Sequence, residues 1–310
     1  MNTVSTKLLQ SICTVLIGKE EQVRTVVVAL LAKGHVLIEY IPGVGKTLLA
    51  LATARSIGGR FRRIQFTSDT LPSDVIGINV YDPKTNEFEF KEGPLFTDVL
   101  LADEINRTSS RTQSAMLEAM AEGKVSVDGR TYDLADPFLV LATMNPVERF
   151  GSFQLPESQL DRFMVSISLW YPDRDHEREI LARDLEHVDA ERLEPITNAE
   201  TIRELQHRIR QIRVESSMME YLLDLIKATR DHPEIRLGIS SRGGLHLKRA
   251  MQSSALLEGR DYVVPQDLRR VFIPVSLHRI LTLEHAGDGM ARKRKRDILN
   301  QALRSVAAPV

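Results

Sequence analysis

The residues with the clearest capacity for chemistry lie between positions 39 and 49, which read Glu-Tyr-Ile-Pro-Gly-Val-Gly-Lys-Thr-Leu-Leu. The two glycines allow backbone conformations that point successive N–H groups inward, and such a nest binds phosphate oxygens. The partial positive charge of a following helix N-terminus favours the same ligand. Lys46 can reach the β- and γ-phosphates of a nucleotide, and the Thr47 hydroxyl can coordinate magnesium. The pattern predicts a nucleotide-binding loop made of Pro42, Gly43, Val44, Gly45, Lys46, Thr47 and Leu48.

A second chemical signal is the acidic pair that ends the apolar run Val99-Leu-Leu-Ala-Asp-Glu104. At the end of a strand, Asp103 can hold the magnesium shell, which leaves Glu104 to polarise an attacking water. General-base catalysis of this kind contributes ~10²–10⁴-fold to a rate. An acidic pair after a strand can also be an ordinary helix cap, but its place downstream of a phosphate loop favours catalysis. Together the two motifs predict hydrolysis of ATP or GTP rather than binding alone.

These residues need a scaffold that brings strand ends together, and the sequence predicts a parallel sheet. Short apolar runs alternate with polar loops or helical patterns, for example a helix over 48–56 that Gly58-Gly59 stops. Strands that alternate with helices are typical of an α/β fold with helices on both faces of the sheet. The expected strands are His35–Glu39, Arg63–Phe66, Val99–Ala102 and Phe138–Ala142.

Two segments break this rhythm and are interpreted as β-hairpins. Residues 78–90 alternate between apolar and polar side chains on both sides of Asp82-Pro83 and Asn86. Residues 125–132 flank Asp128-Gly129, which is a strong signal for a two-residue turn. Hairpins inserted into an α/β core are usually functional excursions or packing flaps.

The chain becomes helical after Trp170-Tyr171-Pro172, and we place a domain boundary near residue 171. Residues 1–171 are predicted to form the nucleotide-binding core, which begins with helical pieces between Leu8 and Ala32. Residues 172–310 are predicted to form an all-α lid domain. The expected lid helices cover 174–184, 199–212, 217–230, 243–257 and 265–281.

Composition narrows the class of protein further. The chain has 310 residues, of which 43% are hydrophobic and 27% charged, and this balance excludes a mostly disordered protein. No apolar run approaches the ~18 residues of a membrane span, and the first residues lack the pattern of a secretory signal. The single cysteine, Cys13, excludes an intrachain disulfide framework. We expect a cytosolic (cytoplasmic) protein, and its net charge of -1 disfavours nucleic acid as a partner bound by overall charge.

Taken together, the motifs resemble those of the AAA+ ATPases, and within them the MoxR family. They span nearly the whole chain in the family's order, and the second and fifth strings below are much more specific than the phosphate loop. The resemblance implies an αβα core followed by a helical lid, with ATP and Mg²⁺ as ligands. The strings are Pro42-Gly-Val-Gly-Lys-Thr47, Leu101-Ala-Asp-Glu-Ile-Asn-Arg107, Thr112-Gln-Ser-Ala-Met-Leu-Glu-Ala-Met120, Ala142-Thr-Met-Asn-Pro146, Leu155-Pro-Glu-Ser-Gln-Leu-Asp-Arg-Phe163 and Ser240-Ser-Arg242.

The resemblance also implies roles for residues outside the phosphate loop. Asn145 resembles sensor 1, whose amide would orient the water or touch the γ-phosphate, although it could also be a turn residue before Pro146. Arg162 resembles the arginine finger, which reaches a neighbouring subunit's nucleotide and can contribute ~10³–10⁵-fold to turnover. The alternative for Arg162 is a partner within a surface helix. Arg107 is a second candidate for such a contact. Arg242 resembles sensor 2, and whether it acts in its own subunit or a neighbour's stays open.

Four positions depart from the family pattern. Tyr40 stands where the family usually has an acid or glycine, and Ser241 where proline is common. Phe150 replaces a usual acid, and Gln154 a usual proline. None of these changes removes a group that catalysis requires, so they bear on rate and partner choice.

Two charged clusters have a plainer interpretation than a new site. Residues 173–177, Asp-Arg-Asp-His-Glu, could hold a metal, but Asp173 is better interpreted as a helix cap followed by a solvated first turn. Residues 292–296, Arg-Lys-Arg-Lys-Arg, could bind nucleic acid or anionic lipid. A solvated helical face is the preferred interpretation of that run.

The functional expectation is a MoxR-like ATPase that assembles into a hexameric ring with ATP at the subunit boundaries. The resemblance implies chaperone-like remodelling, assembly or activation of protein clients, including metal-containing complexes, often with a partner that bears a von Willebrand factor A-type domain. Two alternatives stay open. One is a DNA-dependent motor of a related helicase or chelatase branch, which would use the hairpins as pore elements. The other is a nucleotide-controlled binding switch with little turnover.

Overall fold

A five-stranded sheet forms the centre of the computed structural model, which describes residues 4–41, 43–144, 155–183, 190–283 and 288–309. The spatial order of the strands is β2-β5-β8-β1-β9, and all neighbours run parallel. The predicted parallel sheet is confirmed, and β9 is a further strand that the sequence patterns did not indicate. The strands are β1 (Val36–Tyr40), β2 (Phe61–Gln65), β5 (Val99–Asp103), β8 (Leu139–Met144) and β9 (Val165–Leu169).

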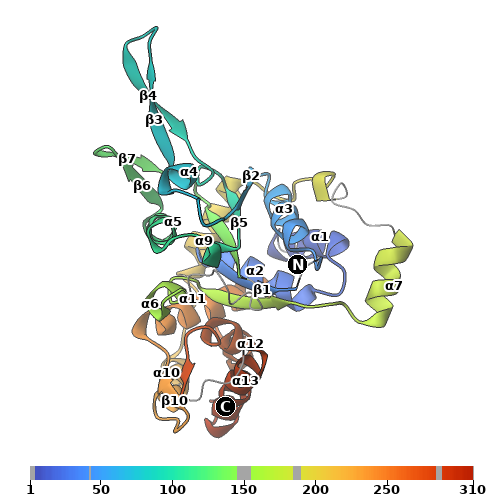
Figure 1. Cartoon of the computed structure of the whole chain (residues 1–310). Coiled ribbons are helices and arrows are strands. Elements are labelled where there is room, and N and C mark those ends of the chain that lie inside the picture. Colours follow the sequence, from blue (N-terminus) through green and yellow to red (C-terminus); the bar gives the residue numbers. More distant parts are fainter. Residues whose placement is uncertain (1–3, 42, 145–154, 184–189, 284–287, 310) are drawn as a thin grey trace.

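Two hydrophobic clusters hold the sheet between helical layers (Figure 1). Successive side chains of a strand point to opposite faces. Val36 and Ile38 of β1 accordingly share a cluster with α1 (Val4–Val15), α2 (Glu20–Leu31) and α3 (Lys46–Ser56). Leu37, between them, packs in the other cluster with buried residues of α5 (Ser110–Glu122). The methionines and leucine of residues 116–120 are therefore core residues, as expected.

The remaining core elements are short, except for two helices that follow β9. The second of these, α9, packs against α2, and Gln206 Nε2 donates a hydrogen bond to the Leu30 carbonyl at 2.8 Å. The chain beyond residue 171 thus returns to the core before the lid begins, and the expected boundary stays a prediction. Among the described residues, no helix has the length and apolar character that a membrane span requires. The remaining elements that the structure describes between the sheet strands and the lid are α4 (Pro72–Ile76), the 3-10 helix η1 (Ile105–Arg107), α6 (Glu157–Leu160), α7 (Arg174–Arg183) and α9 (Ala199–Ile209).

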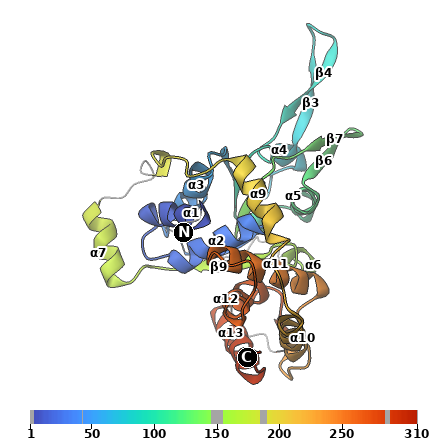
Figure 2. The same ribbon diagram turned by 180° about the vertical axis from the view of Figure 1, so that it is seen from behind.

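In the part of the chain that the structure describes, four helices form the lid at one end of the molecule (Figure 2). Two of them follow the ranges expected over 217–230 and 243–257 closely, and the helix over 288–305 was not among the expected ranges. The helix expected over 265–281 ends at Ser276, because the chain turns there into a short strand. A two-stranded antiparallel pair, β10 (Ile235–Leu237) and β11 (Leu281–Thr282), adds a small sheet to the expected helical lid. The helices are α10 (Ser216–Arg230), α11 (Ser241–Leu257), α12 (Pro265–Ser276) and α13 (Asp288–Ser305).

The basic run of residues 292–296 lies on α13 and makes contacts within the chain. Arg292 forms an ion pair with Glu39 of β1, and both side chains are 20% exposed. Arg294 binds Glu234 through two hydrogen bonds, of 2.7 and 2.6 Å. The interpretation as a solvated face is therefore wrong for Arg292, whose acidic partner comes from a segment distant in the sequence, whereas the Arg294 side chain is 51% exposed.

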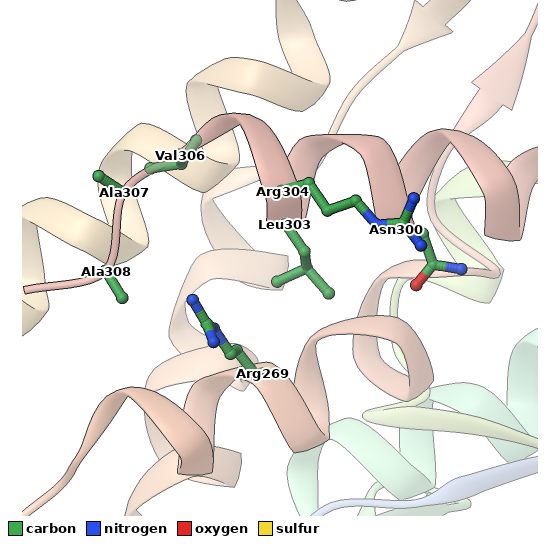
Figure 3. A pocket seen from close by; sticks show the side chains of 7 residues that line it. All are labelled: Arg269, Asn300, Leu303, Arg304, Val306, Ala307 and Ala308. Atoms are coloured by element: carbon green, nitrogen blue, oxygen red, sulfur yellow. The ribbon is translucent and has the colours of Figure 1, made fainter.

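A hollow of about 380 Å³ separates α12 from the end of α13 (Figure 3). Arg269 of α12 faces it from one side, and its Nε donates to the Tyr221 hydroxyl at 3.3 Å. All its lining residues belong to the lid and none to the nucleotide motifs, so this hollow is separate from the site described below. Besides Arg269, the residues that line this hollow are Asn300, Leu303, Arg304, Val306, Ala307 and Ala308.

Both predicted hairpins are confirmed, and they project together from the core (Figure 1). The first consists of β3 (Gly77–Asp82) and β4 (Glu87–Glu92), and the second of β6 (Lys124–Val127) and β7 (Arg130–Asp133). The two hairpins pack on each other through the ring of Phe90 in the first and the ring of Tyr132 in the second, which stack with centroids 4.1 Å apart. Near the free end of the first hairpin, Tyr81 and Phe88 are 49% and 67% exposed.

The base of the first hairpin gives a test of the fold. Gly77 has φ +114°, and a Cβ there would come within 2.3 Å of the Lys91 carbonyl oxygen. We expect Gly77→Ala to destabilise the hairpin by about 2–3 kcal/mol, because both the backbone conformation and the close approach exclude a side chain. Hydrogen exchange over residues 77–92 should rise, and thermal unfolding should show the accompanying loss of stability.

Gly129, in the turn of the second hairpin, provides the matched control. It also has a positive φ, +78°, but a Cβ there meets no atom within 4 Å. Gly129→Ala should cost only about 1 kcal/mol, from backbone strain alone. Equal effects of the two substitutions would show that the close approach at Gly77 does not hold the hairpin.

Candidate active site

The predicted nucleotide loop connects β1 to α3 at the carboxyl edge of the sheet. Gly43 and Gly45 have φ values of +81° and +87°, in the left-handed region that favours glycine. Gly45 is the N-cap of α3, and no side chain caps this helix end. The N–H groups of its first turn can therefore bind phosphate oxygens. Pro42, also predicted for this loop, lies outside the described residues.

Asp103 is a carboxylate with no solvent exposure that lies between two cations. Lys46 Nζ is 2.6 Å from its Oδ1, and Arg63 Nη2 is 2.7 Å from its Oδ2. The Thr143 hydroxyl donates a third contact to Oδ1 at 2.9 Å. A charge buried this deeply is stable only when it is paired and hydrogen-bonded. The pairing therefore places the loop lysine against the end of strand β5.

Glu104, the next residue, has φ +58°, an unusual backbone conformation for a non-glycine residue. Its carboxylate is held on both oxygens. The Tyr40 hydroxyl donates to Oε1 at 3.2 Å, Gln65 Nε2 donates to Oε2 at 2.6 Å, and Arg107 Nη1 lies 2.9 Å from Oε2. Strained residues of this kind are found where a site requires a particular side-chain direction. Here the backbone turns the carboxylate toward β1 and β2.

Tyr40 connects the loop lysine to this carboxylate. Tyr40 is buried, and Lys46 Nζ lies 3.9 Å from the centre of the tyrosine ring, within the range of a cation–π contact. Burial raises the pKa of Tyr40 above its usual value of 10.0, and the protonated hydroxyl donates a hydrogen bond to Glu104. The departure from the family pattern at this position thus lies at the centre of the site.

The sequence did not single out Arg63, Gln65 or Thr143 as site residues. In the pairing of β2 with β5, Gln65 lies opposite Asp103, and Arg63 shares its face of the strand because it is two residues away. The available signal was that Arg63 and Gln65 are polar residues within an expected strand. That signal points to the site only once β2 is known to lie next to β5.

The three candidate arginines lie in three different places. Arg107 pairs with Glu104 of its own chain, whereas Arg162, just after α6, donates to the Leu117 carbonyl of α5 at 2.8 Å. Arg242 is exposed in the first turn of α11. Within the described ranges, no hydrogen bond or ion pair joins Arg162 or Arg242 to the acidic pair. Asn145, the sensor 1 candidate, lies outside those ranges.

Arg162 lies beside a buried ion pair that joins core and lid. Arg279, whose side chain is 1% exposed, places Nε 2.8 Å from Oδ1 of Asp161, and the Ser240 hydroxyl donates to Oδ2 at 2.9 Å. Ser240 also caps α11 by accepting from the Gly243 N–H at 2.9 Å. The lid thus holds the residue that precedes Arg162. A hollow of about 760 Å³ at this junction is lined by Asp161, Ser240 and Arg279 among others.

Comparison with known proteins identifies the family. Residues 35–165 match the model of the ATPase family associated with various cellular activities (AAA), and residues 227–302 match an AAA lid domain. Chaperone MoxR1 of Mycobacterium tuberculosis is 39% identical over 305 residues, which cover 95% of this chain and 80% of the relative. The chain belongs to the MoxR family of AAA+ ATPases. Its enzymatic activity is therefore ATP hydrolysis, and the residues around Lys46 and Glu104 form the candidate site for it.

Other relatives agree with membership of the MoxR family. Protein MoxR of Methylorubrum extorquens is 32% identical over 332 residues, covering 97% of this chain and 94% of the relative. The Bacillus subtilis protein YeaC, described as uncharacterized, is 48% identical over 276 residues, covering 89% and 86%. A crystal structure of a Cytophaga hutchinsonii protein assigned as an ATPase superimposes with a TM-score of 0.87 at 33% identity, covering 99% of this chain and 95% of that one.

Tyr40 gives a test of the site that separates binding from turnover in this MoxR-family ATPase. Tyr40→Phe removes the hydroxyl that reaches Glu104 but keeps the ring against Lys46. We expect kcat to fall about tenfold, since a hydrogen bond to a charged group contributes about 1.5–3 kcal/mol, with nucleotide affinity unchanged within about twofold. Tyr40→Ala, the comparison variant, should weaken both. Steady-state phosphate release and equilibrium nucleotide binding provide the measurements, and loss of affinity in the phenylalanine variant would contradict the assigned contact.

The pair of Asp161 and Arg279 gives a stability test. Asp161→Asn leaves the buried Arg279 without its charged partner, and we expect a loss of about 3–5 kcal/mol in the free energy of unfolding. Asp175→Asn is the matched control, because Asp175 forms an exposed pair with Arg178 (side chains 87% and 68% exposed). It should cost less than about 1 kcal/mol. Chemical denaturation measures both, and similar losses would refute a stabilising role of the buried pair.

Proposed function

We propose that this MoxR-family protein binds ATP with Mg²⁺ at the boundaries between the subunits of a hexameric ring and uses hydrolysis to remodel, assemble or activate protein clients. The observation that carries the ring is the position of Arg162. This arginine lies just after α6, against α5 at the core–lid junction, while the described cations paired with the acidic residues of its own chain are Lys46, Arg63 and Arg107. An arginine placed in this way acts as a finger on a neighbouring subunit's nucleotide.

The residues around Asp103 fit a magnesium–nucleotide complex. The Thr47 hydroxyl in the first turn of α3 and the Asp103 carboxylate at the strand end are the hard oxygen donors that Mg²⁺ prefers. The uncapped helix end and the left-handed glycines supply N–H groups for the phosphates. When bound, Mg²⁺ neutralises charge on the transferring phosphoryl group. Lys46 is a compact cation on a flexible stem, and it can leave Asp103 for phosphate oxygens.

Glu104 is the proposed general base, which accepts a proton from the attacking water. Tyr40 donates to one carboxylate oxygen, and Gln65 and Arg107 donate to the other. Each carboxylate oxygen has two lone pairs, so the hydrogen bond from Tyr40 orients Oε1 and still leaves that oxygen able to accept the proton. Asn145 is proposed to orient the water as sensor 1. Arg242 is the proposed sensor 2, in its own subunit or in a neighbour's.

Protein clients are the favoured substrate class. One relative is named a chaperone, and the exposed pair of aromatic rings on the first hairpin, Tyr81 and Phe88, offers apolar surface to a client chain. With residues 1–171 proposed as the ATPase core and 172–310 as the lid, client choice would depend on the hairpins, the ring surface or a partner. A protein with a von Willebrand factor A-type domain is the proposed partner, and metal-containing complexes are among the proposed clients.

DNA is the less favoured substrate because of the charge on the first hairpin. Residues 77–92 contain four acids, Asp82, Glu87, Glu89 and Glu92, against two lysines. A strand pair with this excess of negative charge repels a phosphate backbone, whereas DNA-binding surfaces neutralise it. ATPase activity should therefore not rise when DNA is added at low salt.

Subunit mixing tests the ring and the finger together. Arg162→Ala subunits keep an intact acidic pair but supply no finger, and Glu104→Gln subunits supply the finger but lack the base. Each variant alone should lose at least about 10²–10³-fold of its ATPase activity. In a 1:1 mixture, random assembly of a head-to-tail ring pairs an intact site with an intact finger at roughly a quarter of the interfaces. Activity should recover in proportion.

Arg178→Ala is the control, because Arg178 is an exposed arginine in a surface ion pair and should neither lose activity nor alter the mixture. Phosphate release measured as a function of the mixing ratio provides the readout. A mixture no more active than the sum of its parts would show that Arg162 does not act between subunits.

A further inference from the structure

Arg162, the proposed finger, lies in a short turn between α6 and β9. Helix α6 spans only four residues, and the turn that follows it comprises residues 161–164. Phe163 and Met164 are buried, and buried backbone carbonyls need hydrogen-bond partners. The conformation of this turn therefore depends on donors that lie outside it.

A single lid side chain, that of Arg279, supplies such donors. Its Nη1 donates to the Met164 carbonyl at 3.0 Å, and its Nη2 donates to the carbonyls of Asp161 and Phe163. Its Nε lies 2.8 Å from the Asp161 carboxylate. The planar fork of a guanidinium can make several such bonds at once. Arg279 therefore contacts the backbone on both sides of Arg162.

The guanidinium of Arg279 is fixed within the lid. His278 Nε2 lies 3.0 Å from the carbonyl oxygen of Phe163, and His246 Nδ1 contacts Nη2 of Arg279. Burial, together with the charge of Arg279, lowers the pKa of both histidines, so that they are neutral at neutral pH. Burial also lowers the pKa of Arg279 to about 10, which leaves the guanidinium charged. The turn is thus held by a charged group that is 1% exposed rather than by a flexible surface side chain.

The lid holds the backbone of the turn and leaves the finger itself to the core. Both views place α6 beside α11 (Figures 1 and 2), whereas the Arg162 side chain donates to the Leu117 carbonyl of α5. We propose that Arg279 is a positioning residue for Arg162, and that its contacts with residues 161, 163 and 164 set the direction in which the finger leaves the turn. The proposal rests on the proposed role of Arg162 and adds that the lid of the same subunit controls it.

The consequence of this arrangement is felt in the neighbouring subunit. In the proposed ring, the finger of one subunit serves the nucleotide of the next, so Arg279 acts on turnover at the neighbour's site and not on nucleotide binding at its own. A displacement of about 1 Å at a catalytic group can cost about 10²-fold in rate. A small shift of Arg279 relative to the core is therefore enough to change the activity of the adjoining site.

Replacement of Arg279 by lysine tests this role. Arg279→Lys keeps a positive charge beside Asp161 but lacks the planar fork. We expect kcat to fall at least about tenfold, with nucleotide affinity unchanged within about twofold. Phosphate release and equilibrium nucleotide binding provide the measurements.

Arg260→Lys is the matched control. Arg260 makes a two-bond fork to the buried Asp267, at 2.7 and 2.8 Å, and the hydrogen bonds that the structure describes for its side chain stay within the lid. This substitution also breaks a fork to a buried aspartate, but kcat should not change. An equal fall of kcat in the two variants would show a general effect of lid stability and would overturn the proposal.

Subunit mixing shows at which site Arg279 acts. Arg279→Lys subunits keep an intact base, so a 1:1 mixture with Glu104→Gln subunits, which supply an intact finger, should exceed the average activity of its parents. A mixture with Arg162→Ala subunits should not, because neither parent supplies a well-placed finger. Recovery in the second mixture alone would show that Arg279 acts at its own subunit's site. Either that result or recovery in neither mixture would overturn the proposal.

A milder variant covers the case in which Arg279→Lys does not fold. Ser240→Ala removes the hydroxyl that donates to the other oxygen of Asp161. It should lower kcat about threefold and show the same pattern in the two mixtures. Thermal unfolding establishes that each variant is folded before its activity is compared.

The mixture of Arg162→Ala with Glu104→Gln separates this proposal from the ring. If that mixture recovers activity and the Arg279→Lys and Ser240→Ala mixtures do not follow the expected pattern, the finger stands and its positioning by the lid is wrong. If that mixture does not recover, the finger and its positioning both fail.

Discussion

The nucleotide site depends on the buried charge of Asp103. This carboxylate ties together four parts of the core: strand β5, the loop lysine at the start of α3, Arg63 on β2 and Thr143 on β8. A buried carboxylate needs compensating charge in every state of the protein. In the proposed nucleotide-bound state, the positive charge of Mg²⁺ would compensate Asp103 when the phosphates attract Lys46. Exchange of one cation for the other would keep the carboxylate neutralised and would let the lysine move without a large electrostatic cost.

Glu104 is constrained in a different way. Its left-handed backbone and the contacts of Tyr40, Gln65 and Arg107 fix the direction of the carboxylate. Three contacts on two oxygens fill fewer than the four lone-pair sites of a carboxylate, so the group is oriented and can still act as the proposed general base. Tyr40 couples this group to the loop, because its hydroxyl reaches Glu104 while its ring contacts Lys46.

Local patterns in the sequence predicted the parts of the fold that depend on neighbouring residues. The phosphate loop, the acidic pair and the turn at Asp128-Gly129 are signals of this kind, and the loop, strand and hairpins lie where they were expected. Strand β9 was not indicated. The roles of Arg63 and Gln65 follow from the order of the strands, which a single sequence does not contain. Arg292 of the basic run was misjudged for the same reason, since its partner Glu39 is distant in the chain.

The contacts at the core–lid junction give the proposed ring a physical route between its sites. The N-cap of helix α11, Ser240, hydrogen-bonds to Asp161, which also pairs with the buried Arg279. Asp161 immediately precedes Arg162. Because Ser240 and Arg279 both belong to the lid, a shift of the lid acts through these two contacts on the residue next to the proposed finger. In such a ring, the fit between one subunit's lid and the next subunit's core sets how well the finger reaches the nucleotide.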